Sequence, residues 1–170
     1  MHKLIALTLL ISIFNINAQK TKLKIGDKIP NFTLYDQHGR LFNSHDHIEK
    51  QPLVIFFYPS NKSKVCTKQA CSFRDNYSKF KKLNAKVVGI NPDYLVNHSE
   101  FSVKNKLPYQ ILADKNNKVQ KLFGVPSLFL SSKPKRYTFV IDKKGFIRNV
   151  YYNRRDVESH ITHALKILNN

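Results

Sequence analysis

The chain has 170 residues, enough for one domain of ordinary size with little room for a second. Hydrophobic residues make up 42% of it, which excludes a disordered chain, and two cysteines cannot form a disulfide-stapled miniprotein. Lys and Arg outnumber Asp and Glu by 29 to 11, so the net charge is +18 and anionic partners are favoured. Because the basic residues are spread along the chain without a basic tail or zinc-finger pattern, we expect no specific nucleic-acid partner.

Residues 1–18 resemble a secretory signal peptide. A short basic start precedes an apolar run from Leu4 to Phe14, and the segment ends at the small residue Ala18. The run is too short for a transmembrane helix, and no later segment is long enough either. We therefore expect a cleaved signal peptide and a single domain over residues 19–170, exported to the periplasm or secreted. A buried N-terminal helix is the alternative interpretation.

The first half of this domain carries clear strand signals. Two short strands, Phe32–Tyr35 and Leu41–Phe42, flank a turn-forming segment that contains Gly39 and predict an N-terminal β-hairpin. The nearly continuous apolar run Leu53–Tyr58 predicts a strand that is buried on both faces and central in a sheet. Pro59 ends that strand.

Helices and strands alternate in the rest of the chain. Apolar residues from Ala70 to Leu83 recur at helical spacing and predict one helix that begins near Cys66. The later predicted elements are strands Val87–Ile90 and Gln110–Ala113, helices Leu95–Asn105 and Asn117–Phe123, a hairpin of Tyr137–Ile141 and Phe146–Tyr151, and a last helix capped by Asp156. This alternation predicts a layered α/β domain.

Cys66 and Cys71 are the only cysteines, and in an exported protein they can be structural, redox-active or metal-binding. Their spacing of five differs from the C-x-x-C of thioredoxin-like oxidoreductases and from the repeated pairs of structural zinc sites. A structural disulfide that closes so short a loop would add little stability. The spacing therefore favours redox chemistry.

The surroundings of Cys66 favour its thiolate. Its predicted place at the start of a helix puts the sulfur near unpaired backbone N–H groups and the positive end of the helix dipole. Three lysines lie close by in the sequence: Lys62, Lys64 and Lys68. We therefore expect Cys66 to be a nucleophile, with a buried inert cysteine as the alternative.

Helix geometry bears on Cys71. In a continuous helix, residues five apart lie roughly 8–9 Å apart, whereas a disulfide requires Cα atoms within about 7 Å. A disulfide between Cys66 and Cys71 therefore requires the first turns of the helix to unwind. Such a bond suits reversible redox chemistry. The alternative is that Cys71 only packs on the helix.

The run from Phe57 to Asp75 resembles the active-site segment of peroxiredoxins, above all the bacterioferritin comigratory protein or Q-type branch, where a resolving cysteine lies five residues after the peroxidatic one. The similarity extends from Ile25–Phe32 through Arg136–Asp142 to the C-terminal helix. It implies a thioredoxin-like α/β fold in which helices flank a central mixed β-sheet, with an N-terminal β-hairpin extension.

The resemblance also implies a role for each matching residue. Cys66 matches the peroxidatic cysteine, which attacks hydrogen peroxide or an organic hydroperoxide and becomes a sulfenic acid, and Cys71 matches the resolving cysteine, which condenses with it to an intramolecular disulfide. Arg136 matches the arginine that holds the thiolate and stabilises the developing oxyanion. Pro59 matches the proline that shields the pocket. The resemblance implies a peroxidase without metal or other cofactor, reduced by a thioredoxin-like dithiol protein. We also expect the chain to be a monomer.

Three positions depart from the family pattern. Ser63 replaces the family threonine, so the hydroxyl that orients the peroxide stays but the methyl group that restricts its rotamer is lost. Lys64 and Val65 replace the usual Pro-Gly before the nucleophile. We expect a less preorganised loop and a reduced activity.

Two other functions remain open from the sequence. One is a thioredoxin-fold copper-binding assembly factor, although its C-x-x-x-C spacing is absent here. The other is a non-catalytic binding module whose basic surface attaches to anionic polymers or membranes, with salt-dependent binding. The pairs His45/His47 and His160/His163 have spacings that suit a metal, but without softer ligands nearby we interpret them as surface histidines.

Overall fold

The computed structural model describes residues 21–170, and the predicted signal peptide, residues 1–18, lies outside them. The strands are β1 (Thr33–Asp36), β2 (Leu41–Asn43), β3 (Leu53–Phe57), β4 (Lys86–Asn91), β5 (Gln110–Ala113), β6 (Tyr137–Ile141) and β7 (Ile147–Tyr152). The helices are α1 (Lys64–Asp75), α2 (Tyr77–Lys82), α3 (Leu95–Lys104), α4 (Lys118–Phe123) and α5 (Glu158–Leu168), and a short 3-10 helix, η1, covers Ser44–His47. In this part of the chain, none of the helices has the length and apolar character needed to cross a membrane.

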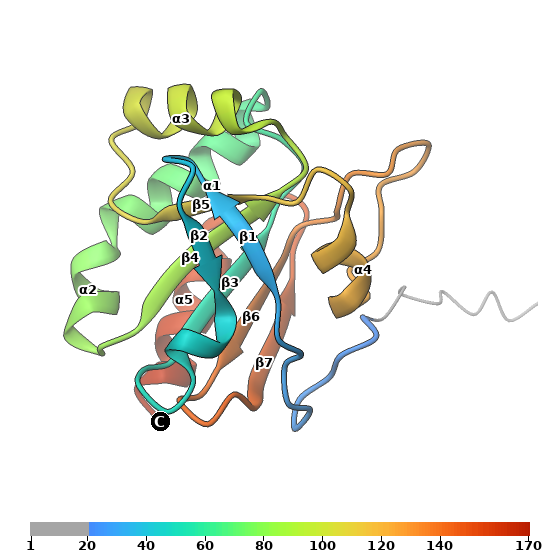
Figure 1. Ribbon diagram of the computed structural model, residues 1–170. Coiled ribbons are helices and arrows are strands. Elements are labelled where there is room, and N and C mark those ends of the chain that lie inside the picture. Colours follow the sequence, from blue (N-terminus) through green and yellow to red (C-terminus); the bar gives the residue numbers. More distant parts are fainter. Residues whose placement is uncertain (1–20) are drawn as a thin grey trace, which may run out of the picture.

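The strands form one mixed sheet in the order β2-β1-β5-β4-β3-β6-β7 (Figure 1). β3, β4 and β5 run parallel, whereas β6 pairs antiparallel with β3 and β7 pairs antiparallel with β6. The β1–β2 hairpin joins β5 in antiparallel pairing and forms the opposite edge. The expected mixed sheet and N-terminal hairpin are both confirmed.

β3 lies between β4 and β6, and its five residues are fully buried. Because successive side chains of a strand point to opposite faces, Leu53, Ile55 and Phe57 pack into one apolar cluster while Val54 and Phe56 pack into another. The continuous apolar run in the sequence therefore reflects a strand with a core on each side.

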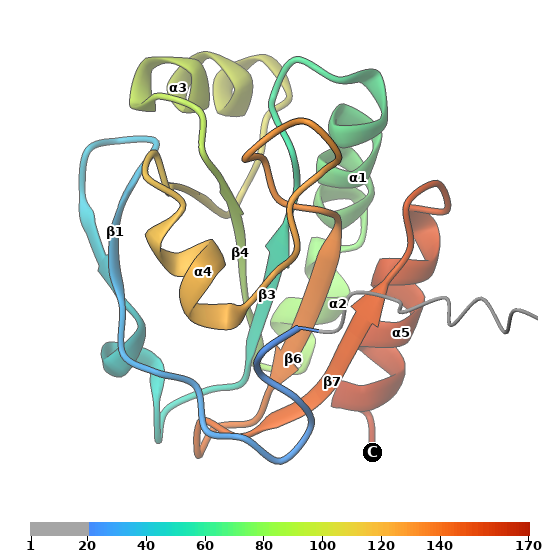
Figure 2. The same cartoon turned by 90° about the vertical axis from the view of Figure 1, so that its right-hand side faces the viewer.

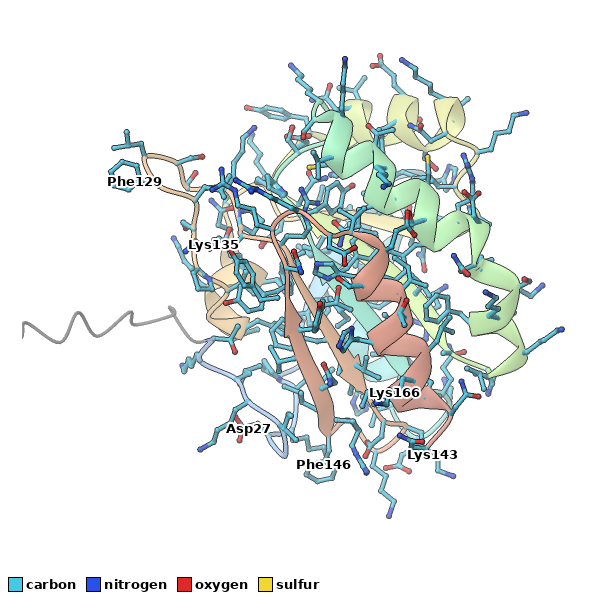
Figure 3. All side chains as sticks on the ribbon, turned by 180° about the vertical axis from the view of Figure 1, so that it is seen from behind. Asp27, Phe129, Lys135, Lys143, Phe146 and Lys166 are labelled. Atoms are coloured by element: carbon cyan, nitrogen blue, oxygen red, sulfur yellow. The ribbon has the colours of Figure 1, made fainter. Side chains whose placement is uncertain are left out.

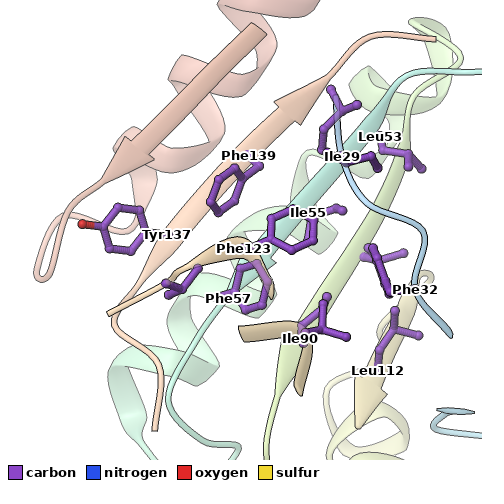
Figure 4. Packing of buried hydrophobic residues seen from close by; sticks show 14 of the residues in the cluster. Ile29, Phe32, Leu53, Ile55, Phe57, Ile90, Leu112, Phe123, Tyr137 and Phe139 are labelled. Atoms are coloured by element: carbon purple, nitrogen blue, oxygen red, sulfur yellow. The ribbon is translucent and has the colours of Figure 1, made fainter. Parts of the chain in front are cut away.

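Helices cover both faces of the sheet. Figure 2 shows α1, α2 and α5 on one face, and α4 with the chain that precedes β1 on the other. The core under α4 is mainly aromatic and branched, and includes Phe32, Ile55, Phe57, Ile90, Phe123 and Phe139 (Figure 4). Cys66 belongs to the opposite cluster, together with Val54, Ala70 and Phe73. Its thiol is therefore held in the core between α1 and the sheet.

Gly89 of β4 allows α1 to pack close to the sheet. A Cβ atom at this position would lie 2.7 Å from the Phe56 ring and 2.9 Å from the Ile111 side chain, too close for a packed core. With no side chain in the way, Phe56 stacks on Phe73 of α1 with ring centroids 4.3 Å apart. The glycine thus helps to seat the helix that carries both cysteines.

The single helix predicted to run to Leu83 is wrong, because two helices occupy this stretch. Asn76 separates α1 from α2 with φ −101° and ψ 6°, and its side-chain amide donates to the Ser72 carbonyl at 3.0 Å. Asparagine competes in this way with helical hydrogen bonds. Tyr77 and Phe80 keep the helical spacing across the break, so periodicity alone does not reveal it.

The last helix begins as predicted. The Asp156 carboxylate accepts a hydrogen bond from the Ser159 backbone N–H at 3.1 Å and so caps α5. Val157, Ile161 and Ala164 are buried, and α5 contacts β6 and β7. This helix therefore closes the layer beside α1 and supports the strand that follows Arg136.

Candidate active site

Cys66 lies in the first turn of α1, where the chain has crossed from β3 to the helix. β3 ends at Phe57, Pro59 follows, and α1 begins at Lys64. Cys66 is only 1% exposed. The predicted position near the helix N-terminus is confirmed, so unpaired backbone N–H groups and the positive end of the dipole lie close to this residue.

A polar network fixes the loop before α1. The Asp93 carboxylate accepts hydrogen bonds from Ser60 Oγ at 3.0 Å and from the Asn61 backbone N–H at 2.7 Å. Asn61 Oδ1 in turn accepts from Tyr58 Oη at 2.7 Å and from Asn91 Nδ2 at 2.8 Å. Sequence patterns do not reveal this network, because Asn61 and Asp93 are 32 positions apart.

Burial sets the protonation of this network. It raises the pKa of Tyr58 well above its ordinary value, with Tyr109 and Cys66 contributing less, so the phenol keeps its proton and donates to Asn61. Asn61 Nδ2 lies 3.2 Å from His98 Nδ1, and burial lowers the pKa of His98 to about 4. His98 is therefore neutral near pH 7, and its Nδ1 can accept from the Asn61 amide.

Arg136 enters the site from the residue just before β6. It is buried, at 6% exposure, and its Nη2 lies 3.6 Å from Cys66 Sγ. Nη1 donates to Gln69 Oε1 at 2.5 Å, and Nε donates to the Arg154 carbonyl at 3.4 Å. These contacts hold a positive charge beside the sulfur, where it favours an anion.

Gln69 is a site residue that our sequence analysis missed. It is fully buried in α1 and accepts from Arg136, whereas its own Nε2 has no hydrogen-bond partner among residues 21–170. Its spacing of three from Cys66 was the available signal, because residues three apart lie on one face of a helix.

A pocket of about 400 Å³ opens beside Cys66. Its lining comes from the loop and first turn of α1 (Pro59, Ser63 and Val65), from Leu128, Lys135 and Arg136, and from Tyr152, Arg154 and Arg155. Because Arg136 both lines the pocket and contacts Cys66 Sγ, the sulfur lies one side chain away from it. No acidic residue of the described chain lines this pocket, so its field favours a substrate oxygen that gains negative charge.

Cys71 lies in the same helix but outside this pocket. Its half-buried Sγ lies 3.7 Å from Asn105 Oδ1, next to the end of α3, and both cysteines are free thiols. α1 is continuous through both positions. Helical geometry therefore separates the Cα atoms of Cys66 and Cys71 by roughly 8–9 Å, beyond the ~7 Å that a disulfide tolerates.

The first turn of α1 is weakly capped. Ser63 occupies the N-cap position, but its side chain forms no capping hydrogen bond with the described residues, and the first turn has no acidic residue. Lys64 adds a positive charge at the positive end of the helix dipole, which is unfavourable. Further along, the Tyr109 hydroxyl donates to the Ala70 carbonyl at 2.6 Å. The turn around Cys66 can therefore open more easily than the rest of the helix.

The interpretation of His160 as a surface histidine is wrong. Its side chain is fully buried, with Nδ1 at 2.8 Å from Thr138 Oγ1 and Nε2 at 3.0 Å from the Asn153 carbonyl. Burial lowers the pKa of His160 to about 4, so the ring is neutral near pH 7. Over residues 21–170, no group of three or more His, Cys, Asp or Glu side chains is arranged to hold a metal ion.

The sequence matches the AhpC/TSA family over residues 25–150. A protein described as "Peroxiredoxin Q, chloroplastic" from Oryza sativa subsp. japonica is 46% identical over 147 residues, which cover 86% of this chain and 67% of the relative. A protein of the same description from Sedum lineare is 45% identical over 152 residues, which cover 89% of this chain and 81% of the relative.

Comparison with solved structures identifies the fold. Peroxidoxin BcpB from Mycobacterium tuberculosis superposes with a TM-score of 0.81 at 33% identity, over 86% of this chain and 97% of that one. A mutant of peroxiredoxin Q from Xylella fastidiosa superposes with a TM-score of 0.79 over 86% and 96% of the two chains, and at 23% identity it supports the fold alone. The expected thioredoxin-like fold is confirmed.

Proposed function

The chain belongs to the AhpC/TSA family and is a peroxidase of the peroxiredoxin Q type, and from this premise we propose that it reduces hydrogen peroxide and organic hydroperoxides with Cys66 and Cys71. One observation carries the proposal: the Arg136 guanidinium lies 3.6 Å from the Cys66 sulfur at the wall of a cationic pocket. A buried thiol that only filled the core would not need a buried arginine beside it.

In the first step, the Cys66 thiolate attacks the distal oxygen of the peroxide. A sulfur–oxygen bond forms, the oxygen–oxygen bond breaks, and the leaving oxygen takes up a proton to become water or an alcohol. Arg136 stabilises the thiolate and then the charge that develops on the oxygens. Ser63 orients the peroxide with its hydroxyl, and Pro59 shields the pocket from water.

In the second step, the Cys71 thiol attacks the sulfenic sulfur of Cys66. A disulfide forms, the sulfur–oxygen bond breaks, and the oxygen leaves as water. The separation along α1 requires the first turns of the helix to unwind before the sulfurs can meet. The start of α1 supports this motion, because the Ser63 side chain forms no capping hydrogen bond with residues 21–170 that would hold the turn.

A thioredoxin-like dithiol protein is the proposed reductant. Its thiolate attacks the Cys66–Cys71 disulfide, and a second thiol of the reductant releases the reduced peroxidase, so two electrons and two protons return to the cysteines. The chain performs this cycle as a monomer and needs no metal or other cofactor, since sulfur carries both electrons.

We also propose that the protein is exported. The apolar run from Leu4 to Phe14 and the small residue Ala18 support a cleaved signal peptide and a periplasmic or extracellular location. The rice and Sedum relatives are described as chloroplastic, so relatives of this chain occur in a compartment other than the cytosol.

A single-turnover experiment tests the mechanism. The reduced protein is mixed with one equivalent of hydrogen peroxide, and free thiols are counted by mass spectrometry in the wild type, Cys66→Ser and Cys71→Ser. We expect rapid loss of two thiols in the wild type, a trapped sulfenic acid in Cys71→Ser, and no reaction in Cys66→Ser. Wild-type thiols that react no faster than free cysteine would contradict the proposal.

A further inference from the structure

The segment between α4 and β6 forms a projecting turn with an apolar tip, Phe129 and Leu130. These residues are 90% and 91% exposed. Figure 3 shows Phe129 at the end of a loop that reaches away from the body of the molecule, with Lys135 at the base of the loop. The Leu128 N–H donates to the Lys133 carbonyl at 2.8 Å, so the base of the loop is hydrogen-bonded. The apolar tip is thus held in solvent by an ordered backbone.

The residue preferences of β-turns do not explain why Phe129 and Leu130 occupy this tip. The Ser131 N–H donates to the Leu128 carbonyl at 3.2 Å, which places Phe129 and Leu130 at the two central positions of a β-turn. These positions favour Gly, Asn, Asp and Pro. Leu130 also has a φ of 57°, in the left-handed region that large side chains rarely adopt. Two large apolar residues therefore occupy positions that local structure disfavours.

Basic and amphipathic side chains surround the tip. A hollow of about 760 Å³ is lined by Phe129 and Leu130 together with Lys135, Tyr152 and Arg154, and no acidic residue of the described chain lines it. Tyr152 is 44% exposed, and tyrosine is enriched where an apolar layer meets water. The surface thus combines two exposed apolar side chains, Phe129 and Leu130, with the positively charged side chains of Lys135 and Arg154.

We propose that the apolar tip binds the surface of an anionic phospholipid bilayer. Phe129 and Leu130 enter the boundary of the acyl chains, while Lys135 and Arg154 face the headgroup phosphates. The tip exposes two large apolar side chains, whereas a stable protein–protein interface takes about 20–30 residues from each partner. A fluid bilayer can close around the tip without matching its shape. The net charge of +18 adds long-range attraction to an anionic surface.

The position of the tip also orients the active site, and this part of the inference rests on the proposed function. The hollow and the pocket beside Cys66 share four lining residues: Leu128, Lys135, Tyr152 and Arg154. A molecule bound through its tip therefore presents the Cys66 pocket to the bilayer surface. The hydroperoxides within reach are then those carried by the lipids themselves.

Co-sedimentation with vesicles tests the binding. The reduced full chain is compared with Phe129→Ser/Leu130→Ser and with a control, Val96→Ser/Val103→Ser, which removes two other exposed apolar side chains from α3. The vesicles contain phosphatidylcholine alone or phosphatidylcholine with phosphatidylglycerol. All proteins keep the same N-terminal segment, so differences report the substituted surface.

We expect the wild type and the control to bind the mixed vesicles, less strongly as salt is raised, and to bind phosphatidylcholine weakly. The tip variant should partition at least about tenfold less. Equal binding by the tip variant and the wild type, or no binding by the wild type, would overturn the proposal. So would concentration-dependent dimerisation that the tip variant abolishes, if the wild type does not bind vesicles.

A fluorescent variant gives a second test that does not depend on removing the tip. The chain has no tryptophan, so Phe129→Trp provides a single reporter. Its emission should shift to the blue with the mixed vesicles, and an unchanged spectrum would contradict insertion. Hydrogen peroxide consumption without vesicles is measured in parallel, and the tip variant should retain it. Vesicle binding by a chain without peroxidase activity would refute the proposed function and leave the membrane proposal standing.

Discussion

Cys66 and Cys71 lie in one helix, but their surroundings differ. Cys66 is 1% exposed, with the buried Arg136 guanidinium 3.6 Å from its sulfur. Cys71 is half-buried, and its sulfur lies 3.7 Å from the neutral side-chain oxygen of Asn105. The first thiol therefore has a neighbour that stabilises negative charge, whereas the second has a weak hydrogen-bond partner.

A second contrast concerns how firmly the backbone is held on either side of the N-terminus of α1. The loop before it is anchored by Asp93 through Ser60 and Asn61, whereas the side chain of Ser63 forms no capping hydrogen bond with the described residues. The loop before α1 is thus anchored, whereas the turn that carries Cys66 is weakly held. A two-cysteine cycle requires this combination, because the peroxide needs a fixed pocket and the disulfide needs a helix that opens.

The largest effect is expected from Arg136→Lys, which removes the guanidinium that distinguishes the surroundings of Cys66 from those of Cys71. Lysine keeps the charge but cannot contact Cys66, Gln69 and the Arg154 carbonyl together. The rate of Cys66 oxidation by hydrogen peroxide in stopped flow should fall by about a hundredfold or more. The matched control is Arg148→Lys, an exposed arginine paired with Asp142, which should react like the wild type. Equal rates for both variants would contradict the role of Arg136.

Acid should lower the stability of the folded protein, because two buried histidines must take up protons. His98 and His160 are neutral in the folded protein, with pKa values lowered to about 4 by burial, whereas in the unfolded chain they take up protons near pH 6.5. Stability present above pH 6.5 is therefore lost as the pH falls towards 4. Between pH 7 and pH 5, each histidine should lower the free energy of unfolding by about 2 kcal/mol. Urea unfolding at the two pH values checks this, and equal stability would refute it.

Gln69→Leu should loosen Arg136 without removing its charge. The variant removes the acceptor of the Nη1 hydrogen bond from the interior, so the guanidinium becomes less well placed beside Cys66. We expect the rate of Cys66 oxidation to fall by about tenfold, because a hydrogen bond to a charged group contributes on the order of 1.5–3 kcal/mol. Gln69→Glu restores an oxygen acceptor and should recover part of the rate. If Gln69→Leu reacts like the wild type, Gln69 only fills space.

The smallest effect is expected from Ser63→Thr. The added methyl group restricts the rotamers of the hydroxyl at the pocket wall and should raise the rate with hydrogen peroxide by about twofold to threefold. The same assay with Ser78→Thr, in α2 and away from the pocket, serves as the control. A slower Ser63→Thr would show that the pocket does not accommodate the methyl group.

Local signals in the sequence predicted most of the architecture. The apolar run of β3, the glycine-containing hairpin turns and the Asp156 cap each depend on neighbours in the sequence. The errors arose where a distant partner or a single side chain decides the outcome. Asn76 breaks a helix whose apolar spacing continues, and His160 is buried because β6 supplies Thr138 as its partner.

In the site, too, local sequence signals predicted some residues, whereas others depend on contacts with distant partners. The spacing and basic flanks of Cys66 predicted a nucleophile, a role that stays a prediction, and the family resemblance pointed to Arg136 before its contact with Cys66 was known. Gln69 and Asp93 were missed because their significance depends on partners 67 and 32 positions away. Local periodicity describes an element, whereas the contacts between elements build the site.

Hydrogen exchange of the reduced and oxidised protein tests the central claim most directly, since that claim is that α1 opens at its first turn to let Cys66 reach Cys71. After one equivalent of hydrogen peroxide, we expect the amides of residues 67–71 to exchange at least about tenfold faster than in the reduced protein, while β3 and β6 stay protected. Unchanged protection across residues 67–71 in a protein that has lost both thiols would contradict the account. So would a disulfide that joins two chains.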